Sequence, residues 1–394
     1  MSFNFETSVD RTGIGNMKGT FSRQAGGEKE RIILAGAEMD YQTAPVICGA
    51  ASRLAERGLF GYTLPDTQYL DTVAAWMKSA RDLACEPDEI VPTLGTIFGL
   101  CTAIRAFTDV DDGVIIQHPS YFRFDEAIRK VGRRVVSNPL IEENCTYHLD
   151  FADLEEKMRN RRNKMMVLCN PHNPTGKVFT EDELKRLASL AKAYGTIIFS
   201  DEIFAEVTYG DHVAIPYVKI DPEHAVTSTS LGKVFSMTGV NHANMLIKSA
   251  GLRERYLKQR TADHFGSIDP FFYAALTAGY SKEGWDWVQE MKAQVWGNYQ
   301  YIRQVLEHQI PEIRVSPLEG TYVAWMDFRK LRLSEKELQE FLVNKVNVLG
   351  DPGNEYGPGG SGFYRFNIAT PRRNIAAFME NLQTACKPAF QGNQ

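Results

Sequence analysis

The sequence predicts an α/β protein whose large domain is a mostly parallel sheet flanked by helices. Between residues 113 and 248, short β-rich runs alternate with helical stretches. Strands joined by crossover helices lie parallel and bind ligands beyond their carboxyl ends. After residue 284 the pattern changes to a long helical tract followed by isolated strands and short helices. This change predicts a smaller α+β domain in the C-terminal part.

Each element is predicted from its own periodicity and its flanking residues. Strands are expected at 114–117, 134–137, 165–169, 196–200, 225–229, 243–248, 321–327 and 363–368. Helices are expected at 45–57, 68–84, 96–107, 181–194, 285–308 and 335–345, and from residue 371 onward. The expected division is an N-terminal arm (1–45) that belongs to the small domain, a large domain (46–284), and a connecting helix with the C-terminal small domain (285–394).

Composition narrows the function classes. The 394 residues carry 44 Lys and Arg against 49 Asp and Glu, and 43% are hydrophobic, which is typical of a folded protein of two or three domains. A mildly acidic chain without a basic stripe is not expected to bind nucleic acid. No apolar run reaches the ~20 residues that span a bilayer, and no signal peptide is recognisable. The six scattered cysteines indicate reduced thiols, so we expect a cytoplasmic protein without a metal.

Two familiar motifs fail in their context. Residues 357–362 match G-x-G-x-x-G but precede a predicted strand instead of following one, which argues against a dinucleotide site. Ser230 and Lys233 match the S-x-x-K of acyl-serine enzymes, but the partner motifs K-T-G and S-D-N do not occur in the sequence. A serine nucleophile is therefore a poor explanation of this pair.

Polar residues instead follow three successive strands. Asn173 lies in a turn after one strand, Asp201 follows the next, and Ser230 with Lys233 follows the third. Taken alone, these residues suit a turn, a helix cap and a solvated loop. Because carboxyl ends of parallel strands meet at one edge of a sheet, we expect them to form one site.

In these motifs the sequence resembles the fold type I pyridoxal-phosphate enzymes, the aminotransferase class I/II superfamily. The resemblance implies that Lys233 forms a Schiff base with the cofactor. It also implies that Asp201 pairs with the pyridine nitrogen and that Asn173 bonds the phenolic oxygen. A carboxylate at that nitrogen keeps the ring protonated, which makes it an electron sink.

The same resemblance assigns the remaining cofactor contacts. Tyr121, just past a predicted strand, is expected to stack on the ring. The phosphate is expected to be held by Gly95, Thr96 and Ser230. A helix that begins after a Gly-Thr turn offers free N–H groups to an anion, which suits this assignment.

Within the superfamily the chain is most similar to the MalY/PatB group of cystathionine β-lyase-like enzymes. The likeness is carried by residues 37–41, 59–62, 200–203, 233–235 and 362–367. It implies that Tyr62 reaches the phosphate in a neighbouring subunit, and hence a homodimer. It also implies that Arg365 binds the substrate carboxylate, with Tyr121 and Tyr41 on the substrate side. A planar guanidinium suits this role because it pairs two-for-two with a carboxylate.

Three positions depart from the family pattern. Asn241 stands eight residues after Lys233, where many relatives have an arginine, so the phosphate is expected to rely on hydroxyls and amides. Phe204 replaces a tyrosine or histidine, which removes one donor near the cofactor. Glu38 replaces an aspartate in a segment that folds over the active site in relatives.

The predicted function is therefore pyridoxal-phosphate chemistry on a small amino acid. β-Elimination from a cysteine thioether such as cystathionine, giving pyruvate, ammonia and a thiol, is the leading reaction. Transamination is the alternative, because both reactions begin with removal of the Cα proton. A third hypothesis is a catalytically silent relative that only binds ligands, although Lys233 and Asp201 are both present.

Overall fold

The computed structural model describes residues 3–11, 13–18, 20 and 31–391. At its centre is a seven-stranded sheet in the order β2-β10-β9-β8-β7-β3-β4. The strands are β2 (Ile90–Thr93), β10 (Ala243–Leu246), β9 (Ala225–Thr229), β8 (Ile197–Asp201), β7 (Asn163–Cys169), β3 (Gly113–His118) and β4 (Arg134–Pro139). β10 is antiparallel to both of its neighbours, and the other pairs are parallel. The predicted α/β class is confirmed.

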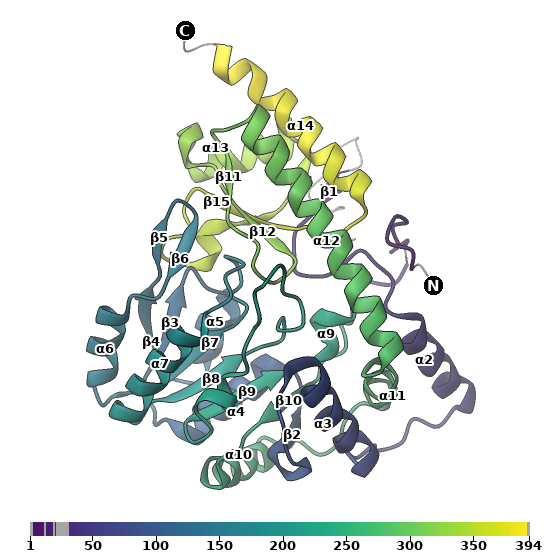
Figure 1. Cartoon of the computed structure of the whole chain (residues 1–394), viewed down its shortest axis with the longest axis vertical. Coiled ribbons are helices and arrows are strands. Elements are labelled where there is room, and N and C mark those ends of the chain that lie inside the picture. The colour runs from purple at the N-terminus through teal and green to yellow at the C-terminus, as the bar shows by residue number, and fades with distance from the viewer. Residues whose placement is uncertain (1–2, 12, 19, 21–30, 392–394) are drawn as a thin grey trace.

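Helices cover both faces of this sheet (Figure 1). They are α2 (Pro45–Arg57), α3 (Thr67–Arg81), α4 (Thr96–Phe107), α5 (Phe122–Lys130), α6 (Phe151–Arg159), α7 (Glu181–Tyr194), α8 (Tyr217–Ile220), α9 (Leu231–Val234), α10 (Ala250–Ala262) and α11 (Pro270–Gly279). The bounds of α7 follow from its sequence. The Thr180 hydroxyl accepts from the Glu183 N–H at the start of α7, and Gly195 ends it at φ 69°.

The two faces of β7 show why its sequence is continuously apolar. Met165 and Val167 pack in the core under α4, α5 and α10, whereas Met166 and Leu168 pack in the core on the opposite face. Successive side chains of a strand point to opposite faces, so a strand covered on both sides carries no polar alternation. The fold therefore leaves the ends of these strands as the places where polar side chains gather.

A second, antiparallel sheet lies in the C-terminal part, in the order β11-β12-β15-β14. Its strands are β11 (Arg314–Val315), β12 (Val323–Asp327), β15 (Phe363–Asn367) and β14 (Asp351–Pro352). The long helix α12 (Lys282–Gln309) runs from beside α11 up to this sheet, where it packs along α14 (Arg372–Gln391), with α13 (Glu335–Glu340) nearby (Figure 1). The predicted domain boundary at residue 284 falls in the first turn of α12, and the division into domains stays a prediction.

Two small sheets complete the structure. β1 (Ile32–Ile33) pairs in parallel with β13 (Val348–Leu349), which joins the N-terminal part to the C-terminal part. β5 (Ile141–Glu143) and β6 (Thr146–His148) form a hairpin. The predicted helix 335–345 is found as α13 followed by a π-helical turn over Phe341–Lys345. Within the described residues, no helix is long and apolar enough to span a bilayer.

Candidate active site

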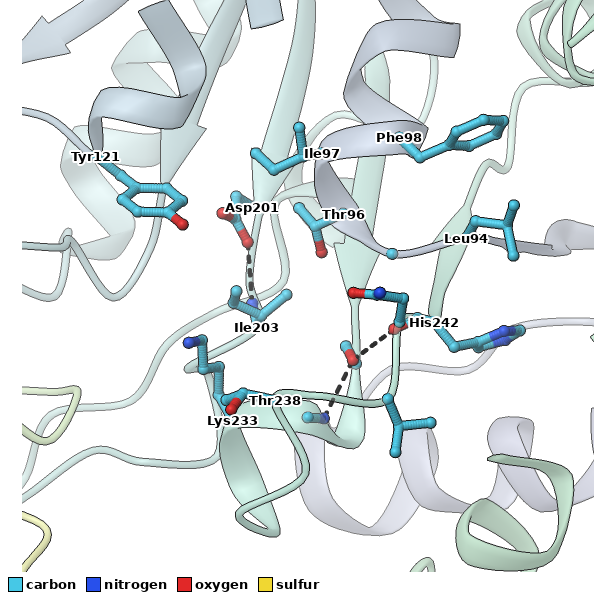
Figure 2. Close-up of a pocket in the computed structure, with 15 residues that line it drawn as sticks. Leu94, Thr96, Ile97, Phe98, Tyr121, Asp201, Ile203, Lys233, Thr238 and His242 are labelled. Atoms are coloured by element: carbon cyan, nitrogen blue, oxygen red, sulfur yellow. Dashed lines mark hydrogen bonds between the residues drawn. The ribbon is translucent and has the colours of Figure 1, made fainter. Parts of the chain in front are cut away.

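The site lies at the edge where the parallel strands end. β10 runs in the opposite direction, so its first residue, Ala243, pairs with Thr93 at the end of β2. The loops that leave this edge enclose a cavity of about 200 Å³ (Figure 2). Six of the predicted site residues line it: Gly95, Thr96, Tyr121, Asp201, Ser230 and Lys233. The sheet thus brings together residues from four separate segments of the chain.

Lys233 enters the cavity from the short helix α9. The side chain of Ser230, the residue before α9, accepts from the Gly232 N–H at 3.1 Å and fixes the start of the helix. The Lys233 ammonium donates to the carbonyl oxygen of Ala37 at 2.7 Å. Burial, followed by the charge of Arg365, lowers the pKa of Lys233 to about 8. An amine with a lowered pKa is available in its neutral, nucleophilic form near neutral pH.

Asp201 is the last residue of β8 and points into the same cavity (Figure 2). It is 4% exposed, and its Oδ1 accepts one backbone N–H, from Ile203, at 3.3 Å. Burial raises the pKa of Asp201 to about 7, although the charge of Lys233 opposes the shift. A carboxylate held this way favours a cationic partner placed beside it.

The opposite side of the cavity is built from hydroxyls and helix N–H groups. Gly95, at φ 82°, makes the turn before α4, and Thr96 begins the helix. The Thr96 and Ser228 hydroxyls lie 2.9 Å apart, and the Ser230 hydroxyl donates to the His242 carbonyl at 2.7 Å. Of the described residues that line the cavity, Lys233 is the single cation. An anion bound here is surrounded by helix N–H groups and hydroxyls. This agrees with the expectation drawn from Asn241, which stands where many relatives have an arginine.

Arg365 lies on β15, is 3% exposed and is not among the residues that line this cavity. Its Nε and Nη2 groups donate to Oδ2 of Asp351 at 3.0 and 2.6 Å. Its Nη1 donates to Oδ1 of Asn173 at 2.8 Å. Arg365 and Asn173 are therefore in direct contact, which the sequence did not predict, and the charge of Arg365 reaches Lys233. The sequence analysis gave no sign of Asp351, because nothing in its local sequence marks it as a partner of Arg365.

The segment Gly36–Asp40 crosses next to Lys233. The Ala37 carbonyl accepts from Lys233 and also from the Tyr322 hydroxyl, at 3.0 Å. Glu38 is paired with Arg11 from the N-terminal arm. The resemblance predicted that this segment lies near the active site, but it did not predict the contribution of Tyr322. A buried tyrosine just before a strand carries no sequence signal of that kind.

Besides Asn173 and Arg365, two further predicted residues do not line the cavity, Tyr41 and Tyr62. The Tyr41 hydroxyl donates to the Thr370 carbonyl at 2.7 Å, and its ring packs edge-on against Phe5 in the core. Tyr62 is 99% exposed. Phe204, the departure from the family pattern, packs edge-on against Tyr322, and the Lys233 nitrogen lies 5.8 Å from the centre of its ring.

These groups fit pyridoxal phosphate by their chemistry. The cofactor has an aldehyde, a basic ring nitrogen and a phosphate, which match an amine, a buried carboxylate and a set of hydroxyls and N–H groups. The deciding observation is Asp201, a buried carboxylate that forms no salt bridge with any described residue, although the charge of Lys233 acts on it. A protonated ring nitrogen supplies a cationic partner.

Comparison with known proteins agrees with this chemistry. Cystathionine β-lyase PatB from Bacillus subtilis is 30% identical over 97% of this chain and 99% of its own length. Protein MalY from Escherichia coli is 28% identical over 98% of this chain and 99% of its own length. The crystal structure of cystalysin from Treponema denticola, which contains a pyridoxal 5'-phosphate cofactor, superposes with a TM-score of 0.94 at 30% identity, covering 98% of this chain and 100% of cystalysin.

The family assignment covers most of the chain. Residues 29–382 match the family described as aminotransferase class I and II, and this range includes every residue that lines the cavity. The fold, the strand-end site and the similarity to PatB, MalY and cystalysin lead to the same conclusion. This chain belongs to the aminotransferase class I and II family.

Proposed function

We propose that this protein is a pyridoxal-phosphate-dependent carbon–sulfur β-lyase acting on a cysteine thioether. The observation that carries the proposal is the meeting of Lys233 and Asp201 in one cavity, with the Arg365 charge close to Lys233. Similarity to PatB, MalY and cystalysin over nearly the full chain supports the lyase reaction over transamination. The net reaction is thioether plus water giving thiol, pyruvate and ammonia.

The protein groups have separate tasks in this reaction. When bound, the cofactor supplies an aldehyde that condenses with amines and a protonated ring that draws electron density from Cα. Lys233 would hold the aldehyde through its amine and, as a free amine, would accept the Cα proton of the substrate at its Nζ. The Asp201 carboxylate would hold the ring nitrogen in its protonated form. Loss of the Cα proton then lets the Cβ–S bond break, and the electron pair leaves with the thiolate.

Arg365 and Tyr121 have positioning roles in the proposal. Arg365 binds the α-carboxylate of the substrate, and Tyr121 stacks on the cofactor ring. Tyr121 lines the cavity, and burial raises the pKa of its hydroxyl, so it stays neutral. Gly95, Thr96 and Ser230 hold the phosphate. Asn173 bonds both Arg365 and the phenolic oxygen of the cofactor. These assignments follow the chemistry of each group and the family resemblance.

The decisive experiment follows two products at once. Purified holoenzyme is mixed with L-cystathionine, and pyruvate, free thiol and the cofactor spectrum are recorded together. A β-lyase gives pyruvate and thiol in equal amounts while the cofactor returns to its starting spectrum. Conversion of the cofactor to its amine form without pyruvate would instead establish an aminotransferase. The Lys233→Ala variant is the control and should give neither result.

We also propose a homodimer in which Tyr62 completes the partner's site. The segment around Tyr62 exposes a group of large apolar side chains, and a folded monomer rarely leaves so many together. They are Leu59, Phe60, Tyr62 and Leu64, at 76, 55, 99 and 64% exposure. Phe60 also stacks on Phe271, with the ring centres 5.5 Å apart. Light scattering should give twice the mass of one chain, and a monomeric mass at working concentration would refute the dimer.

A further inference from the structure

The partner of Arg365 is fixed by strand register. Asp351 on β14 stands directly opposite Arg365 on β15 in an antiparallel pair. Directly opposed side chains lie close enough for contact. Gly350 permits the close approach, because a Cβ there would collide with the Phe366 ring and the Arg365 carbonyl. The carboxylate therefore occupies this place by construction of the sheet.

Asp351 accepts hydrogen bonds from one edge of the Arg365 guanidinium, so part of the guanidinium remains for other partners. It accepts from Nε and Nη2, while Asn173 accepts from Nη1. A guanidinium has five N–H groups, so with these three bonds one N–H remains on each terminal nitrogen. The Tyr356 ring, 5.1 Å below the guanidinium carbon, holds its plane. What remains suits one further carboxylate.

The charge around this edge is already balanced. Arg365 and Asp351 together carry no net charge before a ligand binds. Asp351 and Glu38 are also both close enough to raise the pKa of Lys233 against the effect of its burial. Asp351 is further anchored by the Gly36 N–H, at 3.0 Å from both of its oxygens. A second carboxylate placed on this side of Arg365 would therefore meet the Asp351 carboxylate, which already pairs with the guanidinium.

We propose that Asp351 is a specificity-determining residue that restricts the site to ligands with a single carboxylate near Arg365. The inference rests on the proposed role of Arg365 as the carboxylate-binding residue. One carboxylate fits the free terminal edge, and a second one is repelled by Asp351. Repulsion of the wrong ligand is a common source of specificity. The site would thus disfavour aspartate-like and glutamate-like amino acids, which agrees with the proposed thioether substrate.

The test compares two carboxylates of equal chain length, butyrate and succinate, by calorimetric titration of the holoenzyme. The wild-type protein should bind butyrate about tenfold more tightly than succinate. Asp351→Asn keeps an acceptor for Gly36 and removes the charge, so succinate binding should tighten about tenfold and the preference should largely disappear. Asp351→Glu should retain the preference.

Two further variants separate the possible failures. Asp327→Asn breaks a comparable ion pair with Arg314 and Arg329 in the same sheet, away from the cavity, and should leave the preference unchanged. Arg365→Ala should weaken both ligands; if it does not, the proposed role of Arg365 fails, whatever Asp351 does. Equal weakening of both ligands in Asp351→Asn would show a purely structural anchor. Tighter binding of succinate than butyrate by the wild-type protein would overturn the proposal without any variant.

Discussion

The two sides of the cavity are assembled differently. The side proposed for the cofactor uses short loops at the ends of neighbouring strands, between Gly95 and His242. The side proposed for the substrate joins residues from opposite ends of the chain: Gly36 bonds Asp351 across 315 positions, and Ala37 bonds Lys233 across 196. The residues proposed to bind the cofactor can therefore be recognised from local sequence motifs. The residues proposed to bind the substrate are brought together by packing between distant parts of the chain.

The largest effect is expected on the cofactor side, at Lys233. Lys233→Ala removes both the amine that binds the aldehyde and the proton acceptor. Turnover should fall by at least ~10²–10⁴, the usual contribution of a positioned acid–base group. Absorbance of the bound cofactor should shift to that of the free aldehyde. An unchanged spectrum would show that another group holds the cofactor.

Asp201→Asn should also lower turnover strongly, by about 10²–10³, because a preorganised charge beside the ring is lost.

The same substitution should raise the stability of the cofactor-free protein at high pH. Burial raises the pKa of Asp201 from 3.8 to about 7, so folding favours the protonated acid. That stabilisation is complete below about pH 3.8 and is lost as the pH rises through about 7. In thermal melts of cofactor-free protein, the variant should therefore exceed wild type by a few degrees above pH ~7 and lose this advantage in acid. A wild-type advantage above pH ~7 would contradict the assignment.

On the substrate side, Arg365→Lys should mainly raise KM. Lysine keeps the charge but not the two-pronged geometry, and charge-assisted hydrogen bonds contribute about 1.5–3 kcal/mol each. KM for the amino acid should rise roughly ten- to a hundredfold, with a smaller change in kcat. The cofactor spectrum without substrate serves as the control and should stay as in wild type. A fall in kcat alone would move Arg365 out of the carboxylate-binding role.

The smallest effect is expected at Tyr322→Phe. The hydroxyl bonds the Ala37 carbonyl that also accepts from Lys233, while the ring packs on Phe204. Removing the hydroxyl should cost about 0.5–1.5 kcal/mol, seen as a change of a few-fold in kcat/KM. Steady-state kinetics with Phe204→Leu as a matched packing variant would separate loss of the hydrogen bond from loss of the ring contact. No change in kcat/KM would remove Tyr322 from the site.

Sequence reasoning succeeded where a residue's neighbours along the chain decide its place. Asp201, Ser230 and Lys233 follow apolar strands, so the sheet edge collects them. It missed β2, whose four residues include a proline, a residue that weakens a strand prediction. It placed Tyr41 near the substrate, but the Thr370 carbonyl holds that hydroxyl in the core. The sequence could not predict Asp351 as the partner of Arg365, because only strand register brings Asp351 opposite it.

The edge position of β2 has a consequence for synthesis of the chain. β2 is hydrogen-bonded to β10 at the end of the large sheet, and it leads directly into the Gly95-Thr96 turn. Domains generally fold as units, so the large sheet is complete only when all of its strands have left the ribosome. A nascent chain that ends before residue 243 already contains Asp201 and Lys233 but not the strand that fixes this turn. If this turn holds the phosphate as proposed, we expect the growing chain to bind it tightly only after β10 has emerged.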